Sequence, residues 1–131
     1  MKEKTVMDAL VQMKRTGNLL NELTDLTRQL GESIDRNDQV SIQMLIAMRE
    51  EPLGKLQAAD KALREQLEAL DDREEAEQLA AILNGGSAGD GGQTVKMLCD
   101  QVALNRRRLK QVMDLDRVLN QRIGRGKSAY Q

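Results

Sequence analysis

The chain has 131 residues, of which 31% are charged and 40% hydrophobic, but its only aromatic residue is one tyrosine. It has no histidine and one cysteine, so zinc sites, Cys–His pairs and Ser-His-Asp triads lack their parts. This excludes most hydrolytic chemistry, and we expect a protein that is not an enzyme and that holds no cofactor or metal. A chain with one tyrosine also cannot build an aromatic platform that stacks nucleic-acid bases.

The length suits one small domain, and the leucine- and alanine-rich apolar positions are typical of helices rather than of a sheet core. The lone thiol of Cys99 cannot close an intrachain disulfide, which fits a reducing compartment. No apolar run reaches the length of about 18 residues that spans a bilayer, and residues 1–4 do not open a signal peptide. We therefore expect a cytoplasmic protein without membrane insertion.

Apolar residues recur at steps of three and four from Thr5 to Ile34, which predicts one long amphipathic helix. Four polar residues at 35–38 separate it from a second periodic segment, so we expect a helical hairpin over residues 1–83. Pro52 removes a backbone donor and clashes with the preceding turn, which predicts that the second helix is kinked or split there. A break is also conceivable at Asp71–Asp72, where Asp71 and Glu74 could form a capping pair, but we expect the helix to continue.

Residues 84–93 contain five of the ten glycines and no large apolar side chain, which predicts a flexible loop. The loop lacks the Gly-Lys-Ser/Thr ending of a phosphate-binding loop, so nucleotide binding is not expected. Residues 94–123 are predicted to form the third helix, and residues 124–131 a mobile tail. The predicted fold is all-α: an elongated antiparallel helical bundle, or coiled coil, of three long helices.

The third helix has the most regular pattern in the chain, a heptad seam in which Asn105 and Asp116 are the polar positions. Polar seam residues can fix the register of packed helices, and they also fit a face that meets a partner rather than a permanent core. We take this face as the candidate surface for binding a partner protein. Its residues are Leu98, Val102, Asn105, Leu109, Val112, Met113, Leu115, Leu119 and Ile123.

Charge is unevenly distributed, because residues 1–83 carry a net charge of −6 and residues 84–131 a net charge of +5. The simplest interpretation is that the basic third helix lies against the acidic second helix near residues 71–77; the alternative is a face for a charged partner. Three successive arginines, Arg106, Arg107 and Arg108, point in three directions on a helix and do not form one patch. Their role stays open, and we expect no nucleic-acid partner.

Six methionines are spread over the three predicted helices. They indicate either an ordinary core or an adaptable groove, because unbranched side chains repack around partners of varied shape. These residues are Met7, Met13, Met44, Met48, Met97 and Met113.

Four segments, Leu19–Thr27, Asn37–Val40, Leu45–Glu51 and Val102–Arg106, together with the order of the helices, resemble the FlgN-like flagellar export chaperones. The related FliT-like chaperones are the alternative assignment. The resemblance covers nearly the whole chain. It implies a cytoplasmic chaperone of type III protein export that binds the C-terminal helical segments of hook-associated proteins, prevents premature assembly and delivers them to the export apparatus. It also implies that the C-terminal helix binds the client and that Tyr130 helps to dock on the export gate.

Two other functions stay open. One is a structural coiled coil that self-associates, for example as a homodimer, without a client; concentration-dependent helicity would favour it. The other is a basic-helix nucleic-acid binder, which a steep salt dependence of binding would favour.

Overall fold

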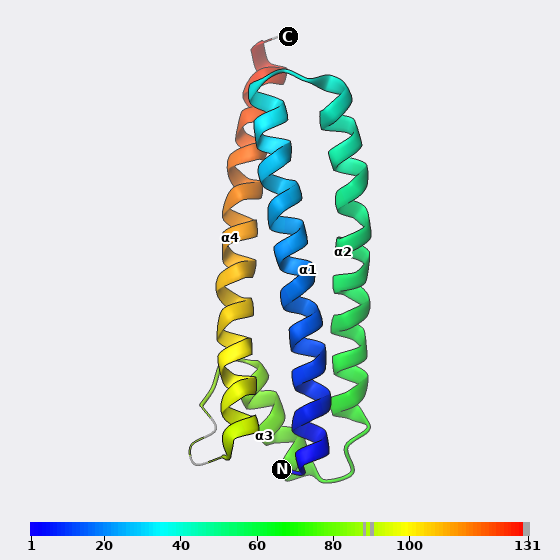
Figure 1. The fold of residues 1–131 in the computed structure, drawn as a ribbon, viewed down its shortest axis with the longest axis vertical. Coiled ribbons are helices and arrows are strands. Elements are labelled where there is room, and N and C mark those ends of the chain that lie inside the picture. Colours follow the sequence, from blue (N-terminus) through cyan, green and yellow to red (C-terminus); the bar gives the residue numbers. More distant parts are fainter. Residues whose placement is uncertain (88, 90, 130–131) are drawn as a thin grey trace.

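The computed structural model describes residues 1–87, 89 and 91–129, without the side chains of 124–129. It contains four helices: α1 (Glu3–Asp35), α2 (Gln39–Glu68), α3 (Arg73–Leu83) and α4 (Gln93–Ala129). This confirms the predicted all-α class. Figure 1 shows α1 lying between α2 and α4, with the short α3 beside the N-terminal end of α1. None of the described helices combines the length and the apolarity that a membrane crossing requires.

A tight turn joins α1 to α2 in the polar segment predicted from the sequence. Asn37 adopts a φ of 56°, a left-handed conformation that asparagine tolerates better than most residues. Asp38 caps α2, because its carboxylate accepts the backbone N–H of Ser41 at 3.1 Å and the Ser41 hydroxyl at 2.7 Å. The turn sends α2 back along α1 in the antiparallel direction (Figure 1).

α2 runs through Pro52 without a break, so the predicted split of the helix at this residue is wrong. Proline removes one backbone hydrogen bond from a helix. The Pro52 ring is fully buried, however, and Leu45 is the only other buried residue that α2 contributes. Burial of the ring takes apolar surface out of water, which offsets the lost hydrogen bond.

α2 and α3 are separate helices, so the expected continuity of one helix over 38–83 is wrong. Residues 69–72 form the turn between them. Asp72 caps α3 by accepting the backbone N–H groups of Glu74 at 3.0 Å and Glu75 at 3.3 Å. The cap is therefore the second of the two aspartates and not the first, and the described part of the chain forms four helices instead of the three predicted.

The described residues of the glycine-rich segment, 84–87, 89 and 91–92, lie outside the helices, and Gly85 adopts a φ of 96° that glycine alone reaches without strain. α4 begins at Gln93 and continues to Ala129, past the end predicted at residue 123. Most of the predicted tail is therefore helical. Residues 130–131, its last two, lie outside the described residues.

Two apolar clusters hold the helices together at opposite ends. The first joins α1, α3 and α4 and comprises Val6, Ala9, Leu10, Leu79, Ile82, Leu98 and Val102. The second lies near the α1–α2 turn and comprises Leu26, Leu30, Leu45 and Leu119. α1 and α4 take part in both clusters, whereas α3 takes part only in the first.

Candidate functional site

Most of the predicted binding seam on α4 lies inside the molecule. Five of its nine residues are buried: Leu98, Val102, Asn105, Val112 and Leu119. Leu115 and Ile123 are half-buried, whereas Leu109 and Met113 are 47% and 62% exposed. The buried residues hold α4 to the rest of the chain and present no surface to a partner in this structure. Only Leu109 and Met113 offer the open apolar surface that the sequence predicted for the whole seam.

Asn105, a polar residue of the seam, has its partners within the chain. Its Nδ2 donates to the backbone carbonyl oxygen of Met13 at 2.7 Å, and its Oδ1 accepts from Gln101 Nε2 at 3.0 Å. Gly17 of α1 allows this close approach, because a Cβ built there would lie 2.8 Å from Asn105 Oδ1. Asn105 therefore fixes the register of α4 on α1.

Asp116, the other polar residue of the seam, is paired with α2. Arg49 Nη2 donates to Asp116 Oδ1 at 2.6 Å, and the Arg49 side chain is largely buried. Its Nε has no hydrogen-bond partner in the described part of the chain. Because a buried charge is costly without a partner, this ion pair fixes how α2 and α4 lie against each other.

α3 fills a fourth helix position beside the long helices, but only at one end of the molecule. Its Ile82 is buried in the same cluster as Val102 of α4. At the end of α3, Arg106 Nη1 donates to the carbonyl oxygen of Asn84 at 3.0 Å. Figure 1 shows α3 covering only a short part of the long helices. Farther along α4 than Arg106, no described helix takes its place.

The apolar seam of α4 becomes open surface where α3 ends. Leu109 lies seven residues after Val102, so the two side chains share a face of the helix. Val102 is buried, whereas Leu109 is exposed. Met113 lies one turn farther along and is exposed as well. The same face is thus covered at one end by α3 and uncovered beyond it.

α2 contributes two exposed apolar side chains next to the Arg49–Asp116 ion pair, which joins it to α4. Ile46 and Leu53, which are 45% and 40% exposed, lie at i−3 and i+4 from Arg49, on the face from which Arg49 reaches α4. Because α2 and α4 run in opposite directions, Leu53 lies on the same side of the ion pair as Leu109 and Met113. We call this surface the α2–α4 strip. It consists of Ile46, Leu53, Leu109 and Met113.

Sequence reasoning missed the α2 half of the strip. Neither Ile46 nor Leu53 was among the candidate binding residues, although their seven-residue spacing beside Arg49 is a usable signal. Three other large apolar residues of α2 are also exposed: Val40, Met44 and Met48. Five of the six methionines named above are exposed, which fits the adaptable surface better than the ordinary core.

The basic residues of α4 serve several separate purposes. Arg106 binds the end of α3, Arg107 is exposed, and Arg108 reaches toward Gly17 of α1. The three arginines therefore point apart, as predicted. α4 does pack against the helix that contains most of the acidic segment, because Leu98 and Val102 share a cluster with Leu79 and Ile82 of α3, but in the described ranges no salt bridge joins α4 to residues 71–77. α4 forms ion pairs with the other long helices instead. Arg122 pairs with Asp35 of α1 at 3.0 Å, and Asp116 pairs with Arg49 of α2 at 2.6 Å.

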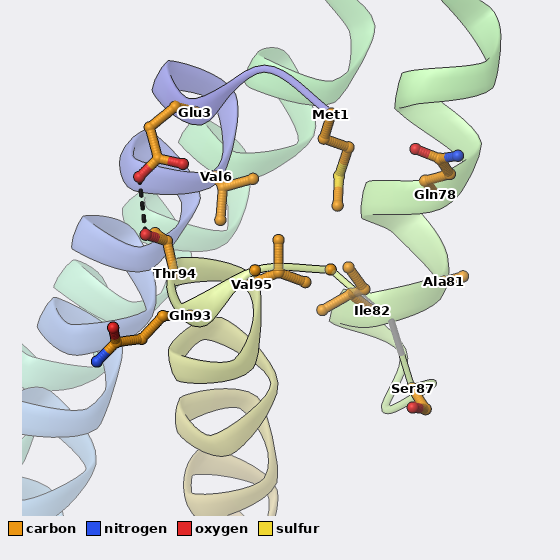
Figure 2. Close-up of a pocket in the computed structure, with 12 residues that line it drawn as sticks. Met1, Glu3, Val6, Gln78, Ala81, Ile82, Ser87, Gln93, Thr94 and Val95 are labelled. Atoms are coloured by element: carbon orange, nitrogen blue, oxygen red, sulfur yellow. Dashed lines mark hydrogen bonds between the residues drawn. The ribbon is translucent and has the colours of Figure 1, made fainter. Parts of the chain in front are cut away.

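A cavity of about 470 Å³ lies where the N-terminal ends of α1 and α4 meet α3. Figure 2 shows Val6, Ile82 and Val95 around it and the Thr94 hydroxyl donating to Glu3 at 2.7 Å. Its lining, as far as described, includes a carboxylate but no lysine or arginine, which is unlike a phosphate site. Among the described residues, no group of three or more His, Cys, Asp or Glu could hold a metal ion. The cavity therefore does not indicate a nucleotide or metal site.

Comparison with protein-family models, curated proteins and solved structures found no significant match to this chain. Tyr130, to which the resemblance gives a role in export-gate docking, lies outside the described residues.

The candidate functional site is the α2–α4 strip, because its four large apolar side chains are exposed.

Proposed function

We propose that the chain is a chaperone of flagellar type III export, of the kind its sequence resembles, and that it works in the cytoplasm. In this proposal α1, α2 and α4 form an elongated antiparallel bundle that serves as a frame. The α2–α4 strip receives the C-terminal helical segment of a hook-associated protein. Binding is stoichiometric and without turnover, and it shields the segment until the export apparatus receives it.

The observation that carries the proposal is the fourth helix position, which α3 fills at one end and leaves open at the other. The open end presents four large apolar side chains, each at least 40% exposed, from the two helices that the Arg49–Asp116 ion pair joins. Grouped exposed apolar side chains mark interaction sites on soluble proteins. An amphipathic helix laid along α2 and α4 would cover the strip in the way that α3 covers Val102.

The open stretch sets the length of helix that fits. Arg106 marks the end of α3, and Ile123 is the last residue of the apolar seam of α4. A rise of about 1.5 Å per residue gives roughly 25 Å between them, which matches a helix of about 17 residues. A helix of this length is marginal by itself in water, so the client segment folds as it binds. Burial of its apolar face should give a negative heat-capacity change.

The test is a calorimetric titration of the full chain with synthetic peptides of the C-terminal helical segments of hook-associated proteins. The strip variant carries Leu109→Asp and Met113→Asp. Its matched control carries Val40→Asp and Met44→Asp, which place the same charges on exposed apolar residues off the strip. We expect one peptide per chain for the wild type and the control, and at least tenfold weaker binding for the strip variant. Equal affinities of the two variants, or no binding by the wild type, would contradict the proposal.

A second copy of the chain is the alternative occupant of the strip. Sedimentation equilibrium without peptide distinguishes it, because the proposal expects a monomer over the concentrations of the titration. A dimer that the strip variant abolishes, together with no peptide binding, would assign the strip to self-association and make the protein a structural coiled coil.

The proposed contact of Tyr130 with the export gate is tested separately. A chain ending at Ile123 retains the whole strip, so it should bind the peptide as the full chain does. It should bind the isolated export-gate protein more weakly. Equal affinity of both chains for the gate protein would remove this part of the proposal.

A further inference from the structure

The two edges of the α2–α4 strip carry opposite charges. On α4, Lys110 lies at i−3 and Arg117 at i+4 from Met113, so both are its neighbours on the helix surface. Arg117 and Met113 also line the same shallow hollow. On α2, Glu50 lies one turn from each of the two strip residues of that helix. All three charged residues are exposed.

These charges are free to meet a partner. Arg117 pairs with Asp114 of its own helix at 3.5 Å, a contact exposed at both ends. In the part of the chain that the structure describes, neither Lys110 nor Glu50 forms a salt bridge. Exposed pairs of this kind contribute little to stability, so Arg117 can exchange its partner at small cost.

We propose, building on the proposed function, that the helix bound on the strip is bipolar. Its apolar stripe faces the strip, an acidic edge lies over Lys110 and Arg117, and a basic edge lies over Glu50. If the helix bound in the reverse direction with its apolar stripe still on the strip, its acidic edge would lie over Glu50 and its basic edge over Lys110 and Arg117, so like charges would meet. The charged edges of the strip therefore select both the class of helix and the direction in which it lies.

The experiment uses the full chain and two synthetic amphipathic peptides with one leucine stripe. One peptide has glutamate along one edge of the stripe and lysine along the other, and the second has glutamine along both. The edge variant carries Lys110→Glu and Arg117→Glu. The control variant carries Lys14→Glu and Arg28→Glu, the same change of net charge at exposed residues of α1.

We expect the wild type to bind the bipolar peptide about tenfold more tightly than the glutamine peptide at low salt. The edge variant should lose this preference, while the control keeps it within about twofold. Equal affinity for both peptides, or an equal loss in the two variants, would overturn the inference and leave the proposed function standing. Absence of binding to either peptide would overturn both.

Discussion

Glu75 of α3 accepts a hydrogen bond from the hydroxyl of Thr5 of α1 at 3.0 Å, across a separation of 70 residues. Its other carboxylate oxygen accepts the backbone N–H of Lys2 at 2.8 Å. The bond from Lys2, assisted by the bond from Thr5, holds the pKa of the Glu75 carboxyl below its ordinary value. The carboxylate thus ties α3 to the start of α1, in addition to the apolar packing of α3.

The lowered pKa of Glu75 predicts an acid-sensitive contribution to stability. A carboxyl whose pKa is lower in the folded state stabilises the fold above its unfolded pKa, and this contribution is lost as the pH falls through the folded value. Glu75→Gln should therefore be less stable than the wild type at neutral pH, and the difference should shrink in acid. Urea unfolding followed by circular dichroism across that pH range measures it.

Glu77→Gln is the matched control for this prediction. Glu77 lies on the same helix but is exposed, and its only described ion pair is with Arg73 at 3.7 Å. Its substitution should change stability little at any pH. If the loss of unfolding free energy in Glu75→Gln stayed the same in acid, the stabilising contact would not depend on the ionised carboxylate of Glu75.

Alanine substitution should have different effects at two helical glycines. Gly54 has no atom near the position of a Cβ, so Gly54→Ala should stabilise α2 by about 0.5–1 kcal/mol through helix propensity. At Gly17 a Cβ would lie 2.8 Å from atoms of Gln101, Asn105 and Arg108. Asn105 cannot move without losing its bond to Met13, so Gly17→Ala should show none of this gain. Thermal unfolding compares the two, and equal stabilisation would contradict the close approach of α4 to α1.

The helices themselves could be predicted from the sequence because their apolar spacing is regular over many turns. The polar segment 35–38 likewise predicts the turn, since Asp38 is a good capping residue wherever it lies. Asp72 is an equally good cap, but local signals at 69–72 do not decide between a continuous and a broken helix. The burial of Leu79 and Ile82 against α1 and α4 decides it, and that contact lies far away in the sequence.

The candidate site could be predicted only in part, because its exposure also depends on contacts between residues far apart in the sequence. A heptad seam shows that one face of α4 is covered, but not whether α1 or another protein covers it. Val102 and Leu109 occupy equivalent positions of the seam, but Val102 is buried in the cluster that α3 helps to form, whereas Leu109 lies beyond α3 and is exposed. The α2 half of the strip depends on the register that Arg49 and Asp116 fix, which no local pattern supplies.

The ion pair between Arg49 and Asp116 predicts an asymmetric response to substitution. Asp116→Ala leaves donors of the largely buried Arg49 guanidinium unsatisfied, which should cost about 1–3 kcal/mol of unfolding free energy. Arg49→Met removes the charge and keeps an apolar side chain, so the double variant Arg49→Met/Asp116→Ala should regain part of this loss. Urea unfolding of the four proteins forms a double-mutant cycle. Additive losses would show that the two side chains are not coupled.

Truncation of leucines separates the residues that fold the chain from those that we propose bind a partner. Leu79 is fully buried in α3, so Leu79→Ala should destabilise the protein by about 2–5 kcal/mol through lost burial and the cavity left behind. Leu53 is 40% exposed, and Leu53→Ala should cost less than about 1 kcal/mol. Urea unfolding measures both variants, and peptide titration of the folded Leu53→Ala protein should show weaker binding. If Leu53→Ala destabilised the chain as much as Leu79→Ala, the strip would be part of the core and not a free surface.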